Sequence, residues 1–148
     1  MTDGLTTIDH AAESARAWVN ELTERLEWTS RRDVLRLLRA TLTAVRDHIG
    51  HDEAAQLAAQ LPVMIRGMFY EGWRPSRTPL KDRSREGFVA DIEARVGDVI
   101  DYCGPRDVAA AFAFIGDKVS AGEIEDVFVG LPKGVRELLR PERGRAPT

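Results

Sequence analysis

Histidine and carboxylate side chains are the groups of this chain that could hold a metal ion. His48, His51 and Asp52 are the one set of such residues that lies close together along the sequence. A structural zinc site needs four ligands, and a catalytic zinc site needs three and an open position. The only other histidine, His10, is far away in the sequence. We therefore expect His48 and His51 to lie at a helix end and in a solvated loop, without a metal.

Acid–base or nucleophilic chemistry finds little support in the remaining motifs. Glu123, Glu125 and Asp126 could act as acid and base, but negative charge is also stabilised in the first turn of a helix, and we favour that role. Cys103 is the only cysteine, so no intramolecular disulfide can form, and we expect it to pack as a small apolar residue. The sequence has no Gly-rich phosphate loop, HExxH, CxxC or nucleophile elbow. We predict no catalytic residue, no cofactor and no enzymatic activity.

Arginine is the residue type whose placement most suggests a binding surface. Arg32, Arg36, Arg39 and Arg46 form a stripe on a predicted helix, about 100° around the helix from its leucine stripe. Residues 74–85 add five basic groups and one acid. Such arginines can lay their stems over apolar surface, or they can form a basic platform for phosphates; both interpretations stay open. The candidate interaction surface comprises Arg32, Arg36, Arg39, Arg46, Arg77, Lys81, Arg83 and Arg85.

Helices must position these residues, because the apolar pattern has a helical period. Leu35, Leu38, Leu42, Val45 and Ile49 recur at spacings of three and four, which places them on one helix face. No segment alternates apolar and polar residues long enough to indicate a strand. The sequence therefore predicts an all-α fold.

Helix ends are also marked in the sequence. Ser30 and Ser120 each precede an acidic residue by three positions, which is typical of a helix N-terminus. Gly50 and Gly97 follow periodic segments, and we expect both to adopt the left-handed conformation that ends a helix.

The second half of the chain resembles the first. Residues 18–69 align without a gap on residues 88–139, and Glu53 then matches Glu123 and Arg66 matches Arg136. We call this pairing of positions the internal alignment. We predict two similar four-helix units, about eight helices in all, packed as one compact helical domain over residues 1–148. The expected repeats span 16–73 and 86–140, a linker covers 74–85, and residues 141–148 form a flexible tail.

The aromatic segment 61–80 and the helix near residue 112 give two further expectations. Pro62 suits the first position of a short helix, and Trp73 after Gly72 should pack back on the preceding helix. Residues 108–115 are apolar on nearly every side, so this helix must be buried on nearly every side. We expect Phe112 and Phe114 to form a seam between the repeats or between subunits.

The bulk composition is that of a globular domain. The chain has 148 residues, of which 43% are apolar and 30% charged. Its longest apolar run, residues 108–116, is too short to span a bilayer. The N-terminal stretch is acidic where a secretory signal would be basic. We expect a cytoplasmic protein that does not bind membranes.

Three segments, "WVNELTERL", "AAQLPVMIRGMFYEGW" and "GEIEDVFVGLPKGVRELL", resemble the family named Domain of Unknown Function 2267. The resemblance covers roughly residues 16–140 and implies an all-α fold with two similar halves. It implies no activity and no catalytic or binding residue. The chain departs from the family pattern around Gly104, where Pro105 takes the place that Leu35 holds in the first repeat.

These observations favour a non-enzymatic helical interaction or adaptor module, whose partner is another protein or a second copy. Nucleic-acid or phosphate binding by the arginine-rich helix edge and linker remains an alternative. So does small-molecule binding in a cleft between the repeats, lined by residues 64–73 and 112–114.

Overall fold

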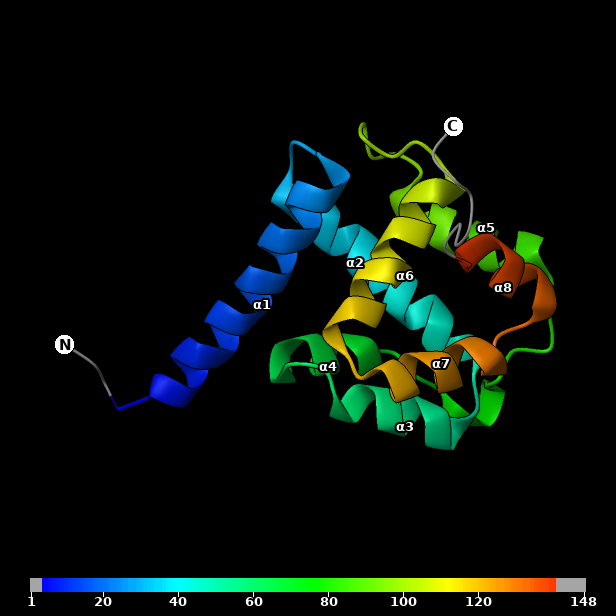
Figure 1. The fold of residues 1–148 in the computed structure, drawn as a ribbon, viewed down its shortest axis with the longest axis horizontal. Coiled ribbons are helices and arrows are strands. Elements are labelled where there is room, and N and C mark those ends of the chain that lie inside the picture. Colours follow the sequence, from blue (N-terminus) through cyan, green and yellow to red (C-terminus); the bar gives the residue numbers. More distant parts are fainter. Residues whose placement is uncertain (1–3, 141–148) are drawn as a thin grey trace.

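The regular structure is entirely helical over residues 4–140, which are the residues described by the computed structural model (Figure 1). This part of the chain holds eight α-helices and one short 3₁₀ helix, η1 (Pro75–Arg77). The predicted all-α fold with eight helices is confirmed. The α-helices are α1 (Thr6–Leu26), α2 (Arg31–His48), α3 (His51–Ala59), α4 (Val63–Tyr70), α5 (Arg85–Val96), α6 (Pro105–Lys118), α7 (Ala121–Gly130) and α8 (Lys133–Leu139).

Helix α2 lies at the centre of the fold, where α1, α4, α5 and α6 pack around it (Figure 1). Its leucine stripe supplies core residues such as Leu38 and Leu42, as the spacing predicts. The helix is buried well beyond that stripe, because Leu37, Thr41 and Arg46 are buried too. A helix with neighbours on several sides cannot keep a broad polar face.

Helix α1 extends past the rest of the molecule. Its buried residues, Ala15, Trp18 and Leu22, all lie beyond its first nine residues. The first half projects away from the other helices at the left of Figure 1, and Ile8 there is 60% exposed.

Most helix ends in the two halves of the chain coincide in the internal alignment. Helices α1 and α5 end at matching positions, as do α2 and α6, while α3 and α7 begin at matching positions, as do α4 and α8. Helix α6 departs from this pattern, because it begins at Pro105, four residues later than the position that corresponds to Arg31. The internal duplication itself stays a prediction.

Local signals account for several helix ends. The hydroxyls of Ser30 and Ser120 accept hydrogen bonds from the main-chain N–H groups three residues on, as predicted. Gly72 has φ +77°, as predicted for a residue that follows α4. The predictions for Gly50 and Gly97 are wrong, since their φ angles are −67° and −63°. Gly50 is instead the extended residue that immediately precedes α3.

The aromatic segment after α4 folds back on the body of the protein. Pro62 is the residue before α4 rather than its first residue. Trp73 is half-buried against the core and stacks obliquely on Tyr70, with ring centroids 5.4 Å apart. Its indole N–H donates to the hydroxyl of Thr78 at 3.2 Å. Trp73 thus secures the chain where α4 ends.

Among residues 4–140, no helix is both long enough and apolar enough to cross a bilayer. The expected flexible tail, residues 141–148, lies outside the described residues.

Candidate functional site

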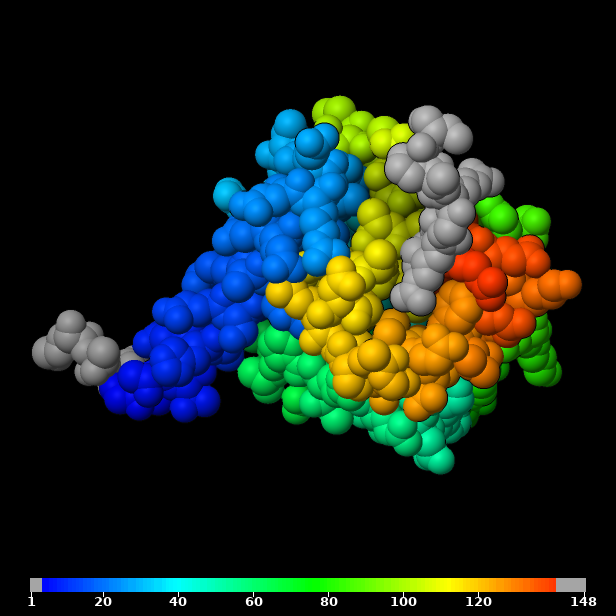
Figure 2. Space-filling view, in the orientation of Figure 1, coloured from blue at the N-terminus to red at the C-terminus, as the bar shows by residue number. Residues whose placement is uncertain are grey.

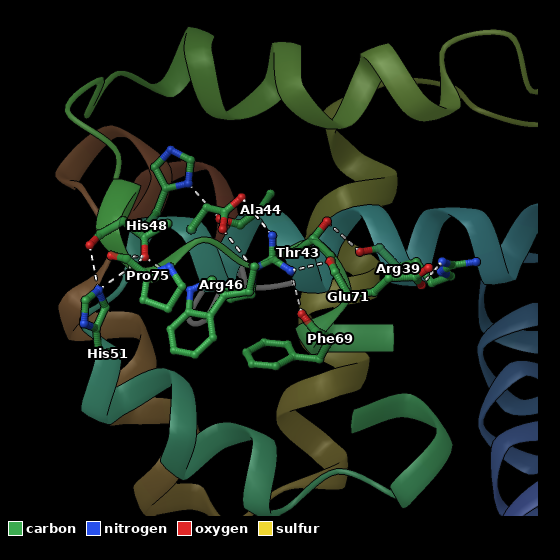
Figure 3. Close-up of polar contacts among 12 residues, drawn as sticks. Arg39, Thr43, Ala44, Arg46, His48, His51, Phe69, Glu71 and Pro75 are labelled. Carbon is green, nitrogen blue, oxygen red and sulfur yellow. Dashed lines mark hydrogen bonds and ion pairs between the residues drawn. The ribbon is translucent and has the colours of Figure 1, made fainter. Parts of the chain in front are cut away.

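Arg46 is a structural residue, although the sequence placed it on a surface stripe. Its side chain is buried, with 3% of the residue exposed, and its guanidinium donates to the carbonyls of Phe69 at 2.8 Å and Glu71 at 2.9 Å (Figure 3). It also pairs with the carboxylate of Asp47 at 2.9 Å. Carbonyls at a helix C-terminus have no partner within their own helix. Arg46 satisfies them at the end of α4 and is not available to a ligand.

Arg36 and Arg39 make similar contacts nearer the surface. Arg36 donates to the carbonyl of Arg95, near the end of α5, at 2.6 Å and to the carboxylate of Asp98 at 2.9 Å. The hydrogen bond and the charge of Arg36 lower the pKa of Asp98 below its ordinary value. Arg39 pairs with Glu71 at 2.6 Å (Figure 3). Three of the four arginines in the α2 stripe, Arg36, Arg39 and Arg46, therefore hold the ends of α4 and α5.

The basic residues of the linker divide into two groups. Arg83 donates to the carbonyls of His48 at 3.0 Å and Gly130 at 3.3 Å, so it ties the linker to both halves of the chain. The other four are exposed and form no ion pair with any residue in the described range; they are Arg74, Arg77, Lys81 and Arg85.

Arg32 lies far from these linker residues. It is exposed at the start of α2, whereas the linker crosses the other end, where the N–H of Leu80 donates to the carbonyl of Asp47 at 2.8 Å. Fifteen residues of α-helix separate Arg32 from Asp47, a distance of about 22 Å. The structure does not bring the eight predicted residues together on one platform.

Phe112 and Phe114, the two predicted seam residues, are both buried, but they pack against different neighbours. Phe114 is fully buried and contacts Trp18 of α1 edge-on, with ring centroids 5.4 Å apart. Phe112 is 5% exposed and lies near Phe128, with centroids 6.5 Å apart. Phe114 thus joins the first and second halves, while Phe112 packs within the second half. Neither ring is available at the surface for a second subunit.

The histidines are held by main-chain carbonyls. His48 is buried, contrary to the expected solvated position, and its Nδ1 bonds the Ala44 carbonyl at 2.7 Å (Figure 3). The Nε2 atom of His51 bonds the Thr78 carbonyl at 2.7 Å. Within residues 4–140, no three His, Cys, Asp or Glu side chains converge as metal ligands. Cys103 is exposed, so the expectation of a packed apolar residue is wrong.

Glu123 is the most perturbed carboxyl group that the structure describes. It lies in the first turn of α7, as predicted, but its side chain is buried, with 7% of the residue exposed. Burial, then a hydrogen bond with Glu53 and the charges of Glu53 and Asp126, raise its pKa to about 7. The Oε2 atoms of Glu53 and Glu123 are buried without a hydrogen-bond donor. The one sequence signal for this pair is the match of the two residues in the internal alignment.

Two surface hollows lie away from the predicted cleft. Neither is lined by residues 64–73 or 112–114. The first, of about 340 Å³, lies between α2 and α5 and already contains a hydrogen bond from Arg95 to Thr43. The second, of about 570 Å³, is an open depression lined by Gly50, His51, Asp52, Glu53, Gln56 and Pro79.

Several large apolar side chains are exposed on α1 and α4. Ile8 on α1 is 60% exposed, and Val63 and Met64 on α4 are 59% and 42% exposed. Helices α1 and α4 pack against each other. Figure 2 shows the first turns of α1 standing clear of the body. We call this region, defined by Ile8, Val63 and Met64, the α1–α4 surface.

A family model described as "Uncharacterized conserved protein (DUF2267)" matches residues 15–138. The chain belongs to the DUF2267 family. The match begins within α1 and ends within α8, so it covers the helical body and leaves out the projecting start of α1. A search of curated proteins returns no match. The DUF2267 description names no activity, and any function must therefore be argued from the residues themselves.

Proposed function

We propose that this DUF2267 protein is a non-enzymatic interaction module that associates with a second copy of itself through the α1–α4 surface. The observation that carries the proposal is the exposed apolar side of the projecting half of α1. The arginine stripe supports this choice of surface indirectly, because Arg36, Arg39 and Arg46 are already engaged within the chain.

The apolar stripe of α1 continues past the point where the body covers it. Ile8 and Ala12 share a helix face with the buried Ala15. A helix normally buries such a stripe against another element. Small residues at positions 11 and 12 also allow a second helix to approach closely, and Ile8 supplies a larger side chain to fill the contact.

Charge on the same helix favours a second copy as the occupant. Asp9 and Arg16 lie two helical turns apart, which places them on one edge of the apolar face. In an antiparallel pair of α1 helices that cross between Ala12 and Glu13, each Asp9 faces the Arg16 of the other chain. Such a contact is self-complementary, as a two-fold dimer requires.

Analytical ultracentrifugation over a wide range of concentration tests the proposal. We expect the mass of the wild-type protein to rise from monomer to dimer. Ile8→Glu should remain a monomer, because a buried charge without a partner is costly. Ile100→Glu is the matched control, since Ile100 is 97% exposed in the loop before α6, and it should dimerise like the wild type. A wild-type protein that is monomeric throughout would refute self-association.

Charge reversal tests the antiparallel geometry separately. Asp9→Arg places two arginines opposite each other and should weaken the dimer. The double variant Asp9→Arg, Arg16→Asp should recover it, because each pair then has opposite charges again. Failure of the double variant to recover would reject this pairing.

A second candidate function rests on the linker. Arg77, Lys81 and Arg85 are exposed and form no ion pair within residues 4–140, so they remain available for a phosphate-bearing ligand such as a nucleic acid. Binding of a fluorescent oligonucleotide should weaken with salt and be lost when all three are changed to Glu. Arg32→Glu is the control, since that exposed arginine lies at the other end of α2. Equal loss in both variants would indicate an effect of net charge alone.

A further inference from the structure

Helices α3 and α7 pack against each other and connect the two halves of the chain (Figure 1). Gln60, just after α3, exchanges two hydrogen bonds with Ser120, just before α7, at 3.1 and 2.6 Å. At the other end, a Cβ atom on Gly130 would lie 3.7 Å from Ile49. The two helices therefore run antiparallel, with the end of each beside the start of the other. We call this region the α3–α7 contact.

A pair of glutamates faces across the α3–α7 contact. Glu53 comes from α3 and is half-buried, and Glu123 comes from α7 and is buried. Their carboxyl groups are close enough to interact, and the Oε2 atom of each is buried without a hydrogen-bond partner. An ionised carboxylate can only accept hydrogen bonds. A hydrogen bond between two carboxyl groups therefore requires a proton on one of them.

The surroundings do not supply a positive charge that would stabilise two carboxylates. From α7 itself, Asp126 adds a further negative charge beside Glu123. On α3, Asp52 is exposed beside Glu53, and the Nε2 atom of His51 is bonded to the Thr78 carbonyl. Neither Glu53 nor Glu123 forms an ion pair with any residue in the described range.

The charged groups of the other neighbouring segments are engaged elsewhere. At the end of α6, the ammonium of Lys118 pairs with Glu21 at 2.9 Å, and Asp117 pairs with Arg25 at 2.7 Å. In the linker, the guanidinium of Arg83 is bonded to main-chain carbonyls. None of these positively charged side chains is therefore free to neutralise Glu53 and Glu123, and only a bound proton can do so.

We propose that Glu53 and Glu123 share one proton in the folded protein, and that loss of this proton as the pH rises loosens the α3–α7 contact. The shared proton makes the contact between the two halves sensitive to pH. This inference rests on the interior of a single chain, so it stands or falls independently of self-association.

The direction of the effect follows from proton linkage. The pKa of Glu123 is raised to about 7 in the fold, from an ordinary value of 4.5. Between these values the folded protein keeps a proton that the unfolded chain has lost. Stability from the pair is therefore fully present below pH 4.5, falls as the pH rises towards 7, and is absent above it. The equilibrium constant for unfolding should rise by roughly a hundredfold across that interval.

Urea denaturation of the full chain at a series of pH values tests the proposal. Glu123→Gln keeps a hydrogen-bond donor for Glu53 but cannot ionise. We expect the variant to lose this pH dependence and to exceed the wild type in stability at pH 8. Glu125→Gln, an exposed residue on the same helix, is the control and should follow the wild type. A difference between wild type and Glu123→Gln that is constant from pH 5 to 8 would overturn the proposal.

A second variant and a local measurement guard against misfolding of the first. Glu53→Gln removes the other carboxyl group and offers an amide donor to the Glu123 carboxylate, so its stability should depend less on pH than that of the wild type. Hydrogen–deuterium exchange, corrected for the intrinsic effect of pH, should show a larger increase in α3 and α7 between pH 6 and pH 8 in the wild type than in this variant. An equal increase in the Glu53→Gln variant would overturn the shared-proton mechanism.

Discussion

Arg66 and Arg136 occupy matching positions in the two halves of the chain and make corresponding hydrogen bonds. Arg66 donates to the carbonyl of Leu61 at 2.9 Å, and Arg136 donates to that of Leu131 at 2.6 Å. Each arginine also donates to the carbonyl two residues before that leucine. In both halves, an arginine within the short final helix thus holds the turn that precedes it. This repeated contact makes the two arginines natural targets for mutation.

We expect Arg66→Lys and Arg136→Lys each to lower the free energy of unfolding by about 1–2 kcal/mol. A lysine ammonium cannot reproduce the planar, multiple hydrogen bonding of a guanidinium, and main-chain carbonyls would lose their donors. Urea denaturation measures the loss. Arg106→Lys is the control, because Arg106 is exposed and its side chain forms no hydrogen bond within the described residues. Unchanged stability in all three would show that the turns do not depend on these arginines.

Arg46 should be far more important to stability than its neighbour Arg39. Arg46→Met leaves the carbonyls of Phe69 and Glu71 and the carboxylate of Asp47 without their donor, at a cost of about 3 kcal/mol. Arg39→Met breaks only a surface ion pair with Glu71, and we expect a loss below about 1 kcal/mol. Thermal and urea denaturation of the two variants measure both values. Equal losses would contradict the structural role of Arg46.

Sequence spacing predicted the helices well because each helix carries its own periodic signal. The leucines of α2 indicate one buried face, and the serine caps mark where two helices start. At Pro105 the structure departs from the internal alignment, and the start of α6 shifts by four residues, since proline suits the first turn of a helix.

The candidate site was less predictable, because exposure depends on which elements pack together. A helical wheel places Arg46 beside the core, but it does not reveal that the end of α4 covers that edge of α2. The Glu53–Glu123 pair was not predicted for the same reason, because two carboxyl groups on separate helices meet only once α3 and α7 are in contact. In both cases the missing information is tertiary.

Gly72 and Gly122 should respond in opposite ways to alanine. Gly72 has φ +77°, a conformation in which a Cβ atom is strained, so Gly72→Ala should destabilise the protein by about 1 kcal/mol. Gly122 lies within α7, and a Cβ atom there would meet nothing within 4 Å. Gly122→Ala should stabilise the protein by about 0.5–1 kcal/mol. Melting temperatures of the two variants should therefore move in opposite directions, and a common direction would contradict the assignment.

Phe114 should stabilise the contact between the two halves of the chain. Its ring is fully buried against Trp18, and Phe114→Ala leaves a cavity that we expect to cost about 3–5 kcal/mol. Phe114→Leu retains most of the volume and should cost about 1–2 kcal/mol. Calorimetry of the two variants measures both losses. Two variants of equal stability would show that the volume of this side chain is not what joins the halves.

Tyr102 should make the protein sensitive to alkali. Its hydroxyl donates to the Glu93 carboxylate at 2.7 Å, and burial, then this hydrogen bond and the charges of Glu93 and Asp107, raise its pKa above the ordinary value of 10. The folded protein keeps the phenolic proton where the unfolded chain loses it. Stability from Tyr102 is thus present below pH 10 and is lost as the pH rises further.

Ultraviolet absorbance of the phenolate during alkaline titration checks this expectation. The chain has two tyrosines, Tyr70 and Tyr102. The Tyr102→Phe variant therefore shows the titration of Tyr70 alone, and subtracting it from the wild-type curve gives the titration of Tyr102. Glu93→Gln removes the negative charge, and we expect Tyr102 to ionise at lower pH in that variant. The substitution Glu93→Gln removes the charge of the Glu93 carboxylate. If the pH at which Tyr102 ionises is unchanged in this variant, the Glu93 carboxylate does not raise the pKa of Tyr102.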